Sequence, residues 1–159
     1  MTWDSFFTAE VGASAALAGL IFVGISINLQ RIIALPMIAN RALQALLILV
    51  GSLGIESLLL VPGQSTTEQG VEVLAVALAL LAALDWIEWR SWHEVDPAYE
   101  RTLRAHSLQI QFPCGFAIVG AVLLLVADPA AVYWFVPATL TSFLVAIVEA
   151  WVITVEIVR

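Results

Sequence analysis

The sequence has 159 residues, of which 62% are hydrophobic and 12% charged, and its formal net charge is −7. Soluble domains are about 45–50% apolar and about 25% charged, so the composition excludes an ordinary soluble protein and indicates a membrane protein. The acidic balance without a basic patch excludes a nucleic-acid-binding protein. The single cysteine, Cys114, excludes an internal disulfide and a thiolate metal cluster.

Five apolar segments are long enough to cross a bilayer, which requires about 20 helical residues. They cover Phe6–Leu29, Ala42–Val61, Val71–Trp89, Ser107–Ala127 and Val132–Val158. Breaks rich in proline, glycine and polar residues separate these segments. The N-terminus lacks the basic region of a signal peptide, so we expect the first segment to stay in the mature protein. The sequence therefore predicts one all-α domain over residues 1–159, a transmembrane bundle of five helices.

The basic residues predict the orientation of this bundle. All six are arginines, and with five spans every one lies on the same side of the bilayer: Arg31, Arg41, Arg90, Arg101, Arg104 and Arg159. The positive-inside rule makes that side cytoplasmic, with the N-terminus outside and the C-terminus in the cytoplasm. Acids without any base gather at the outer side, where they would attract cations: Asp4, Glu10, Glu56, Glu68, Glu72 and Asp128.

The first segment has two polar or small-residue faces. Glu10, Ser14 and Asn28 share one of them with Ile21. Small residues that allow close helix packing lie on the other: Gly12, Ala15, Ala16, Gly19 and Ser26. We expect this helix to pack on both sides, as a central helix or at a subunit interface. Glu10 alternatively extends toward the outer surface.

The second and third segments add further acids. Glu56 lies about a turn and a half from the outer end, with Ser52 one turn away, and Glu72 lies near the outer mouth. The third segment ends in "DWIEWRSWHE", residues 85–94, whose tryptophans are typical of the headgroup region. Asp85 and Glu88 share an arc of this helix, so they either face the bundle or are solvated beneath an aromatic belt.

The fourth segment contains Pro113, which has no N–H to give the carbonyl of Gln109. A freed carbonyl can coordinate a cation, or it can be satisfied by a side chain or water. The fifth segment carries Ser142, Glu149 and Glu156 at seven-residue spacing, on one helix face. Glu149 is the deepest ionisable residue. It either serves a conduction path or is buried, protonated or paired with an arginine such as Arg31.

The sequence has no phosphate-binding loop, catalytic triad or zinc-binding motif. His93 and His106 lie at the cytoplasmic interface, where histidines usually contact headgroups. A metal site with Asp85 or Glu88, or a lipid-modifying enzyme that uses these groups, is the less favoured interpretation. We therefore expect no enzyme activity, no metal and no cofactor.

Two stretches of the first third, "GASAALAGLIFVGISINLQRI" and "NRALQALLILVGSL" followed by "LVPGQS", carry a resemblance. They resemble a family of small bacterial membrane proteins, some loosely labelled modulator of the FtsH protease. The resemblance implies a protein of the bacterial cytoplasmic membrane with a regulatory role. The tryptophan-rich sensory proteins have a similar size and span count, but their proline-rich, tryptophan-containing motif is missing here.

Two functions fit these observations. The first is a homo-oligomeric channel or transporter for a proton or small cation, with a pathway lined by Glu149, Glu156, Ser142, Glu10, Asn28, Glu56, Glu72, Asp85, Glu88 and Gln109. The second is an accessory or regulatory subunit of a larger membrane complex, such as a membrane protease, without transport of its own. The first is the leading hypothesis. The second also explains the small size of the protein, the small-residue face of the first segment and the lack of catalytic motifs.

Overall fold

The computed structural model describes residues 3–92 and 100–158, and in these ranges every regular element is a helix. The helices are α1 (Trp3–Ile27), α2 (Leu29–Ile33), α3 (Pro36–Leu59), α4 (Thr66–Trp92), α5 (Glu100–Leu125) and α6 (Ala131–Val158). All but α2 are long and apolar enough to cross a membrane. The predicted five-span, all-α architecture is confirmed.

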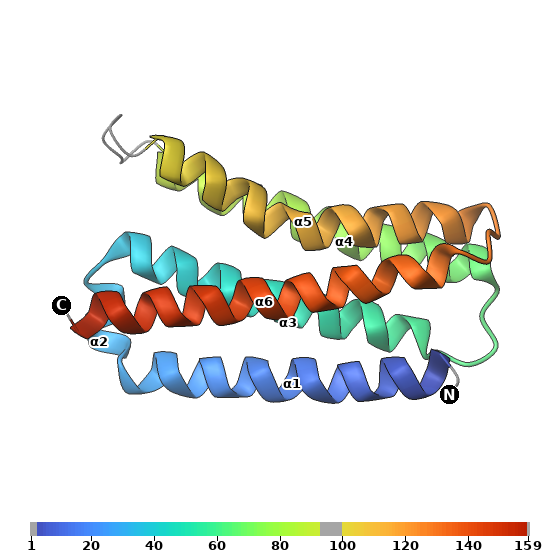
Figure 1. The fold of residues 1–159 in the computed structure, drawn as a ribbon, viewed down its shortest axis with the longest axis horizontal. Coiled ribbons are helices and arrows are strands. Elements are labelled where there is room, and N and C mark those ends of the chain that lie inside the picture. Colours follow the sequence, from blue (N-terminus) through green and yellow to red (C-terminus); the bar gives the residue numbers. More distant parts are fainter. Residues whose placement is uncertain (1–2, 93–99, 159) are drawn as a thin grey trace.

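Consecutive long helices run in opposite directions (Figure 1). The chain therefore has an N-terminal end, where α1 begins and the α3–α4 and α5–α6 turns lie. The opposite end holds α2 and the C-terminus, and we call it the α2 end. Local turn hydrogen bonds stabilise both connections: Val61 N–H donates to the Leu58 carbonyl oxygen after α3, and Asp128 N–H donates to the Leu123 carbonyl oxygen after α5.

The short helix α2 was not expected, because the first span was predicted to continue to Leu29. Instead, α1 ends at Ile27, and Asn28 leaves the helical conformation with φ −108° and ψ 17°. The Asn28 side chain donates to the carbonyl oxygen of Gly24 at 3.1 Å, a local bond that competes with helix continuation. Pro36 disfavours helix at Leu35, which is extended, and then begins α3 at a position that suits proline.

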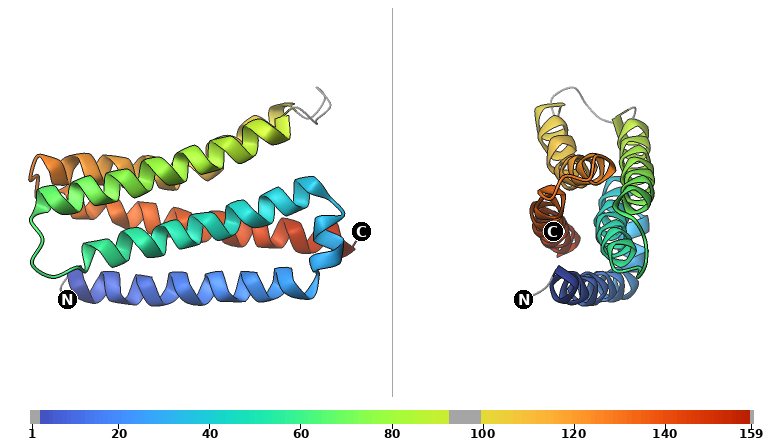
Figure 2. Two further views of the ribbon diagram at one scale, coloured as in Figure 1. Left: turned by 180° about the vertical axis from the view of Figure 1, so that it is seen from behind. Right: turned by 90° about the vertical axis from the view of Figure 1, so that its right-hand side faces the viewer.

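Helix α3, and not α1, is central to the bundle. It packs against α1, α4 and α6, as the end-on view of Figure 2 shows. Helix α1 is peripheral and packs mainly on α3, so it is not the central helix of the protomer, and its place at a subunit interface stays a prediction. The five small residues of the face that was expected to pack closely are exposed: Gly12, Ala15, Ala16, Gly19 and Ser26.

Three apolar clusters follow one another along the bundle. The largest lies toward the N-terminal end and includes Phe7 and Phe135. The second, which we call the middle cluster, consists of Ile48, Leu84, Ile110, Cys114 and Val145. The third lies at the α2 end and includes Ile32 and Ile153. Polar side chains in the interior are therefore confined to the spaces between apolar layers.

Helix α5 bends near Pro113, and the part that precedes it leans away from α3 and α6 (Figure 1). A proline inside a helix removes one backbone hydrogen bond and crowds the preceding turn, which is the usual cause of such a bend. The bend separates the helices at the α2 end, where the functional residues described below reach the surface.

We predict that Gly120→Ala destabilises the bundle. A Cβ atom at Gly120 would lie 2.8 Å from Cζ of Phe135, a buried ring held by its neighbours. Overpacking of this kind costs about 1–3 kcal/mol, more than the helix propensity gained by alanine. Thermal unfolding in detergent should show a lower Tm for Gly120→Ala. Gly115→Ala on the same helix, where a Cβ has open space, is the control and should keep or raise the Tm.

Candidate functional site

Two glutamates in the described residues are almost fully buried, Glu56 on α3 and Glu149 on α6, each 1% exposed. Glu56 lies three residues before the end of α3, toward the N-terminal end, and Glu149 lies in the half of α6 nearer the α2 end. A charge inside an apolar medium is stable only with partners that replace water. The partners of each carboxylate therefore define what it can do.

Glu56 is held by three hydroxyl groups from three helices. Ser14 on α1 donates to Oε2 at 3.1 Å, while Ser52 on α3 and Thr139 on α6 donate to Oε1 at 2.9 and 2.7 Å. All three side chains are buried. We call this group the hydroxyl site. All three donors to the Glu56 carboxylate in this site are uncharged hydroxyl groups.

Glu10 lies beside the hydroxyl site, close enough to Glu56 for the two carboxylates to interact electrostatically. Its Oε2 atom is buried without a hydrogen-bond partner among the described residues. If Glu10 and Glu56 were both ionised, their negative charges would repel each other. A proton shared between them relieves that repulsion.

A cavity of about 20 Å³ adjoins Glu56, large enough for about one water molecule. Polar side chains on its wall are Ser52, Thr139 and Ser142, and Pro113 and Cys114 complete it on the side of α5. The Ser142 hydroxyl donates to the carbonyl oxygen of Ala138 at 2.8 Å, so its oxygen can still accept a hydrogen bond. The cavity thus extends the hydroxyl site by about one water toward the middle of the bundle.

Glu149 is held by charged and polar side chains from α3 and α5. Arg41 Nε lies 3.0 Å from its Oε2, and His106 Nδ1 lies 3.1 Å from its Oε1. The arginine N–H is not aligned on Oε2, so this contact is an ion pair without a directed hydrogen bond. His106 Nε2 lies 3.3 Å from Oε1 of buried Gln44. We call these four residues the ion-pair site.

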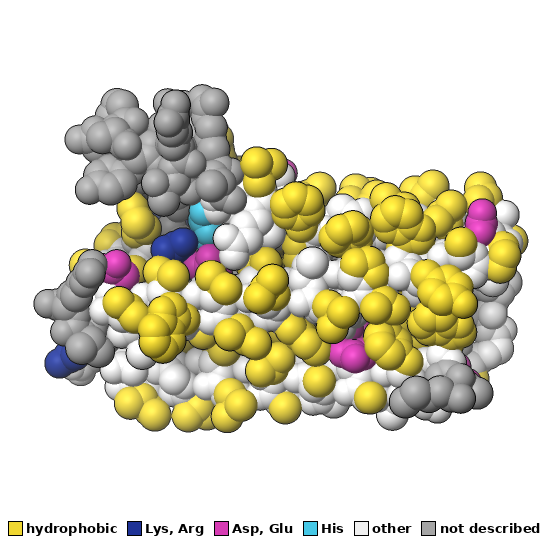
Figure 3. Space-filling view, in the orientation of Figure 1, with side chains coloured by type: hydrophobic (Ala, Val, Ile, Leu, Met, Phe, Trp, Pro, Cys, Tyr) yellow, Lys and Arg dark blue, Asp and Glu magenta, His cyan; other side chains and the backbone are white. Residues whose placement is uncertain are grey.

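Part of the ion-pair site reaches the surface. The side chain of Arg41 is 24% exposed and that of His106 is 11% exposed. In Figure 3, histidine, basic and acidic surface areas adjoin one another toward the α2 end. Glu88 on α4, half-buried, lies close enough to interact electrostatically with His106 and Glu149. The hydroxyl site is buried, whereas the ion-pair site is accessible from the α2 end.

The His106 imidazole can adopt two protonation states in this geometry. Its Nδ1 faces both Glu149 Oε1 at 3.1 Å and Arg41 Nη2 at 3.4 Å. A guanidinium only donates and a carboxylate only accepts, so a neutral Nδ1 accepts from Arg41 and a protonated Nδ1 donates to Glu149. Nε2 donates to the Gln44 oxygen when it carries a hydrogen. The Nδ1 atom can therefore either accept from Arg41 or donate to Glu149.

The middle cluster separates the two sites. Thr139 and Glu149 are ten residues apart on α6, about 15 Å along its axis. Between them lie the buried side chains of Val145, Ile48 and Ile110. The continuous acidic path expected from the sequence is therefore interrupted by an apolar layer in this structure.

The structure places the remaining candidates outside both sites. Asp85 is exposed and accepts from Gln111 at 2.7 Å, while Glu72 accepts from Gln64 at 2.8 Å. Glu156 is exposed, and Asn28 bonds within its own segment. Gln109 is half-buried. His93 lies outside the described residues. Within residues 3–92 and 100–158, no three His, Cys, Asp or Glu side chains are grouped as metal ligands.

Sequence reasoning missed Ser14 and Thr139 as partners of Glu56, and Arg41, Gln44 and His106 as partners of Glu149. The expected pairing of Glu149 with an arginine is present, but the arginine is Arg41 rather than Arg31. Thr139 could have been predicted from its position. It lies three residues before Ser142, so it lies on the same polar face of the last span.

We predict that Thr139→Val weakens the hydroxyl site without changing side-chain volume. The substitution removes the 2.7 Å donor to Glu56 and should lower the free energy of unfolding by about 1 kcal/mol. Thermal unfolding in detergent measures this. Thr141→Val is the matched control, since the Thr141 hydroxyl bonds only to carbonyls of its own helix. Equal effects of the two substitutions would contradict the assigned role of Thr139.

We predict that Arg41→Gln destabilises the protein by about 3 kcal/mol, because it leaves a buried carboxylate without its counter-charge. The double variant Arg41→Gln/Glu149→Gln should recover most of that loss. Chemical or thermal unfolding of wild type, both single variants and the double variant forms a cycle that isolates the pair. Additive losses would show that the ion pair is not the cause.

Comparison with protein-family models, with curated proteins and with solved structures finds no match to this chain. The resemblance of its first third to small bacterial membrane proteins therefore stays a prediction. The chain has five apolar helices, and residues on four of them form the hydroxyl site and the ion-pair site.

Proposed function

We propose that the protein transfers protons across a membrane. Glu10 and Glu56 would serve the N-terminal end, and Glu149 with His106 would serve the α2 end. The observation that carries the proposal is the position of His106 Nδ1, between the buried carboxylate of Glu149 and the guanidinium of Arg41. Histidine gains and loses a proton near neutral pH more readily than any other side chain.

The geometry favours a proton over a metal cation as the transported species. The cavity beside Glu56 has room for about one water and not for a hydrated ion. Glu149 already faces the positive charge of Arg41, which would repel a second cation. In the hydroxyl site the three hydroxyl groups are engaged in donating to the Glu56 carboxylate, and the four residues of the ion-pair site supply oxygens only from Glu149 and Gln44.

Hydroxyl groups suit proton relay, because each one donates and accepts at the same time. Ser14, Ser52 and Thr139 supply such groups around Glu56, and the cavity adds a water position next to Ser142. Passage to Glu149 then requires water to enter the middle cluster. Apolar constrictions of this kind act as gates that open by wetting. In this proposal Ile48, Ile110 and Val145 form the gate.

The proposal includes an orientation and a location. Arg31, Arg41 and Arg90 all belong to the α2 end, which would be cytoplasmic by the positive-inside rule. The bacterial cytoplasmic membrane is the location that the sequence resemblance implies. In a homo-oligomer, each protomer would contain its own hydroxyl site and its own ion-pair site.

A second candidate is an accessory subunit of a larger membrane complex. It is favoured by the exposed side of α1, where Gly12 and Gly19 leave open space at their Cβ positions. Small residues on a lipid-exposed helix permit close approach by another helix. In that case the ion-pair site would only fix the arrangement of α3, α5 and α6.

Flux into liposomes tests the proposal. Wild-type protein should dissipate a pH gradient reported by an enclosed dye, and Glu149→Gln should reduce the rate to that of protein-free liposomes. Glu56→Gln should do the same, because either substitution removes one proton carrier. Glu156→Gln is the matched control, since Glu156 is exposed on the same helix as Glu149. It should keep wild-type flux.

Each variant must be shown to be folded by circular dichroism before its flux is compared. Flux that survives Glu149→Gln in folded protein would contradict the proposed route. Absence of flux from folded wild type under proton, potassium, sodium and calcium gradients would favour the accessory subunit. Co-purification of a partner that depends on Gly12 or Gly19 would then identify that role.

A further inference from the structure

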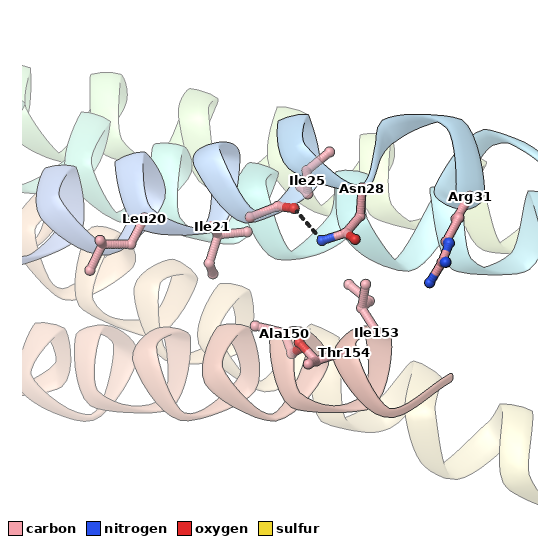
Figure 4. Close-up of a pocket in the computed structure, with 9 residues that line it drawn as sticks. Leu20, Ile21, Ile25, Asn28, Arg31, Ala150, Ile153 and Thr154 are labelled. Atoms are coloured by element: carbon pink, nitrogen blue, oxygen red, sulfur yellow. Dashed lines mark hydrogen bonds between the residues drawn. The ribbon is translucent and has the colours of Figure 1, made fainter. Parts of the chain in front are cut away.

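A groove on the outside of the bundle lies between α1 and α6, at the α2 end (Figure 4). Its volume is about 360 Å³, within the range of pockets that hold small molecules. It exists because α1 packs mainly on α3 and touches α6 little. It is separate from the hydroxyl site and the ion-pair site.

The lining of the groove changes from apolar to polar along its length. Leu20, Ile21 and Ile25 line the part nearer the middle of the bundle. On α6, Ala150 lies nearer to this part, and Ile153 lies across from Asn28 (Figure 4). Asn28 and Arg31 lie at the other end, as Figure 4 shows. From Leu20 to Asn28 the distance is eight residues, or about 12 Å along a helix axis. Half of the hydrocarbon core of a bilayer is about 15 Å thick, so the apolar part matches one leaflet.

The polar end offers hydrogen-bond donors for an anion. Asn28 uses one amide N–H to bond the carbonyl oxygen of Gly24, and an amide has a second N–H to donate. Arg31 has five N–H groups and a permanent positive charge, so it can bind a phosphate along with another partner. The Thr154 hydroxyl, which bonds the Ala150 carbonyl, lies across the groove on α6.

We propose that this groove binds an anionic phospholipid, with an acyl chain along Leu20, Ile21 and Ile25 and the phosphate at Arg31 and Asn28. Three observations agree on this occupant: the apolar length of one leaflet, the donors at its end, and the charge of Arg31. The surrounding bilayer supplies such a molecule at this depth.

Native mass spectrometry of the whole purified chain tests the proposal. Protein in detergent is titrated with phosphatidylglycerol or with phosphatidylcholine, and bound lipid is counted. Wild type should bind phosphatidylglycerol about fivefold more tightly, which is the effect of one arginine near an anionic headgroup. Arg31→Gln should abolish the preference. Arg90→Gln, an arginine of the same end on α4, is the matched control and should keep it.

A second variant tests the groove without touching its charge. Gly24 lines the groove, and a Cβ atom there meets nothing within 4 Å, so Gly24→Leu adds a side chain to the groove from an unobstructed Cβ position. It should reduce binding of both lipids. Gly19→Leu is equally unobstructed on the same helix and lies outside the groove, so it should leave lipid binding unchanged.

The outcomes separate the alternatives. Equal binding of the two lipids by wild type, or equal losses in Gly24→Leu and Gly19→Leu, would overturn the assignment of the groove to an anionic lipid. A dimer that Gly24→Leu disrupts would overturn it in favour of a second copy of the chain. Lipid binding is measured without any gradient, so its result is independent of whether the protein conducts protons.

Discussion

A carboxylate inside hydrocarbon is stable only where other groups of the protein take the place of water, and this constraint organises the whole bundle. Glu56 obtains its partners from α1 and α6 as well as from its own helix, and Glu149 obtains its partners from α3 and α5. Between them, the two glutamates link four of the five long helices. Apolar packing in a bilayer distinguishes poorly between helix neighbours, because lipid tails are as apolar as leucine. Polar contacts therefore specify which helix lies beside which.

Helix α3 is central because it contributes to both sites. Arg41 and Gln44 lie in its first turns and Ser52 and Glu56 in its last, so its polar side chains fall in two groups separated by the apolar Ile48 and Leu49. Helix α6 repeats the pattern, with Thr139 and Ser142 at one level and Glu149 at the other, and with Val145 between them. The two helices pack together so that polar levels face polar levels. A shift of either helix by one turn would place a glutamate against the middle cluster.

The number of helices and their membrane character could be predicted from the sequence because apolar length is a local property. The partners of the carboxylates could not, because they depend on how helices rotate about their axes and on where each helix begins. Arg41 illustrates this. Expecting the second span to begin at Ala42 left Arg41 in a loop, whereas Pro36 begins α3 and places Arg41 in its second turn, facing Glu149. The position of α1 at the edge of the protomer could not be predicted for a related reason: two faces of a helix can each look suited to packing, and only the neighbours decide which one is used within the protomer.

The groove and the ion-pair site lie on neighbouring parts of α6. Ala150, which follows Glu149, lines the groove, and Glu149 itself does not line it but contacts Arg41 and His106. Water that entered the groove would lie within one helix diameter of the buried carboxylate and would weaken its attraction to the guanidinium. An acyl chain in the groove keeps that side of α6 apolar. Access to Glu149 is then restricted to the route past His106 from the α2 end. A proton carrier requires such one-sided access, since a carboxylate open to water from two directions at once would not pass its proton along a defined path.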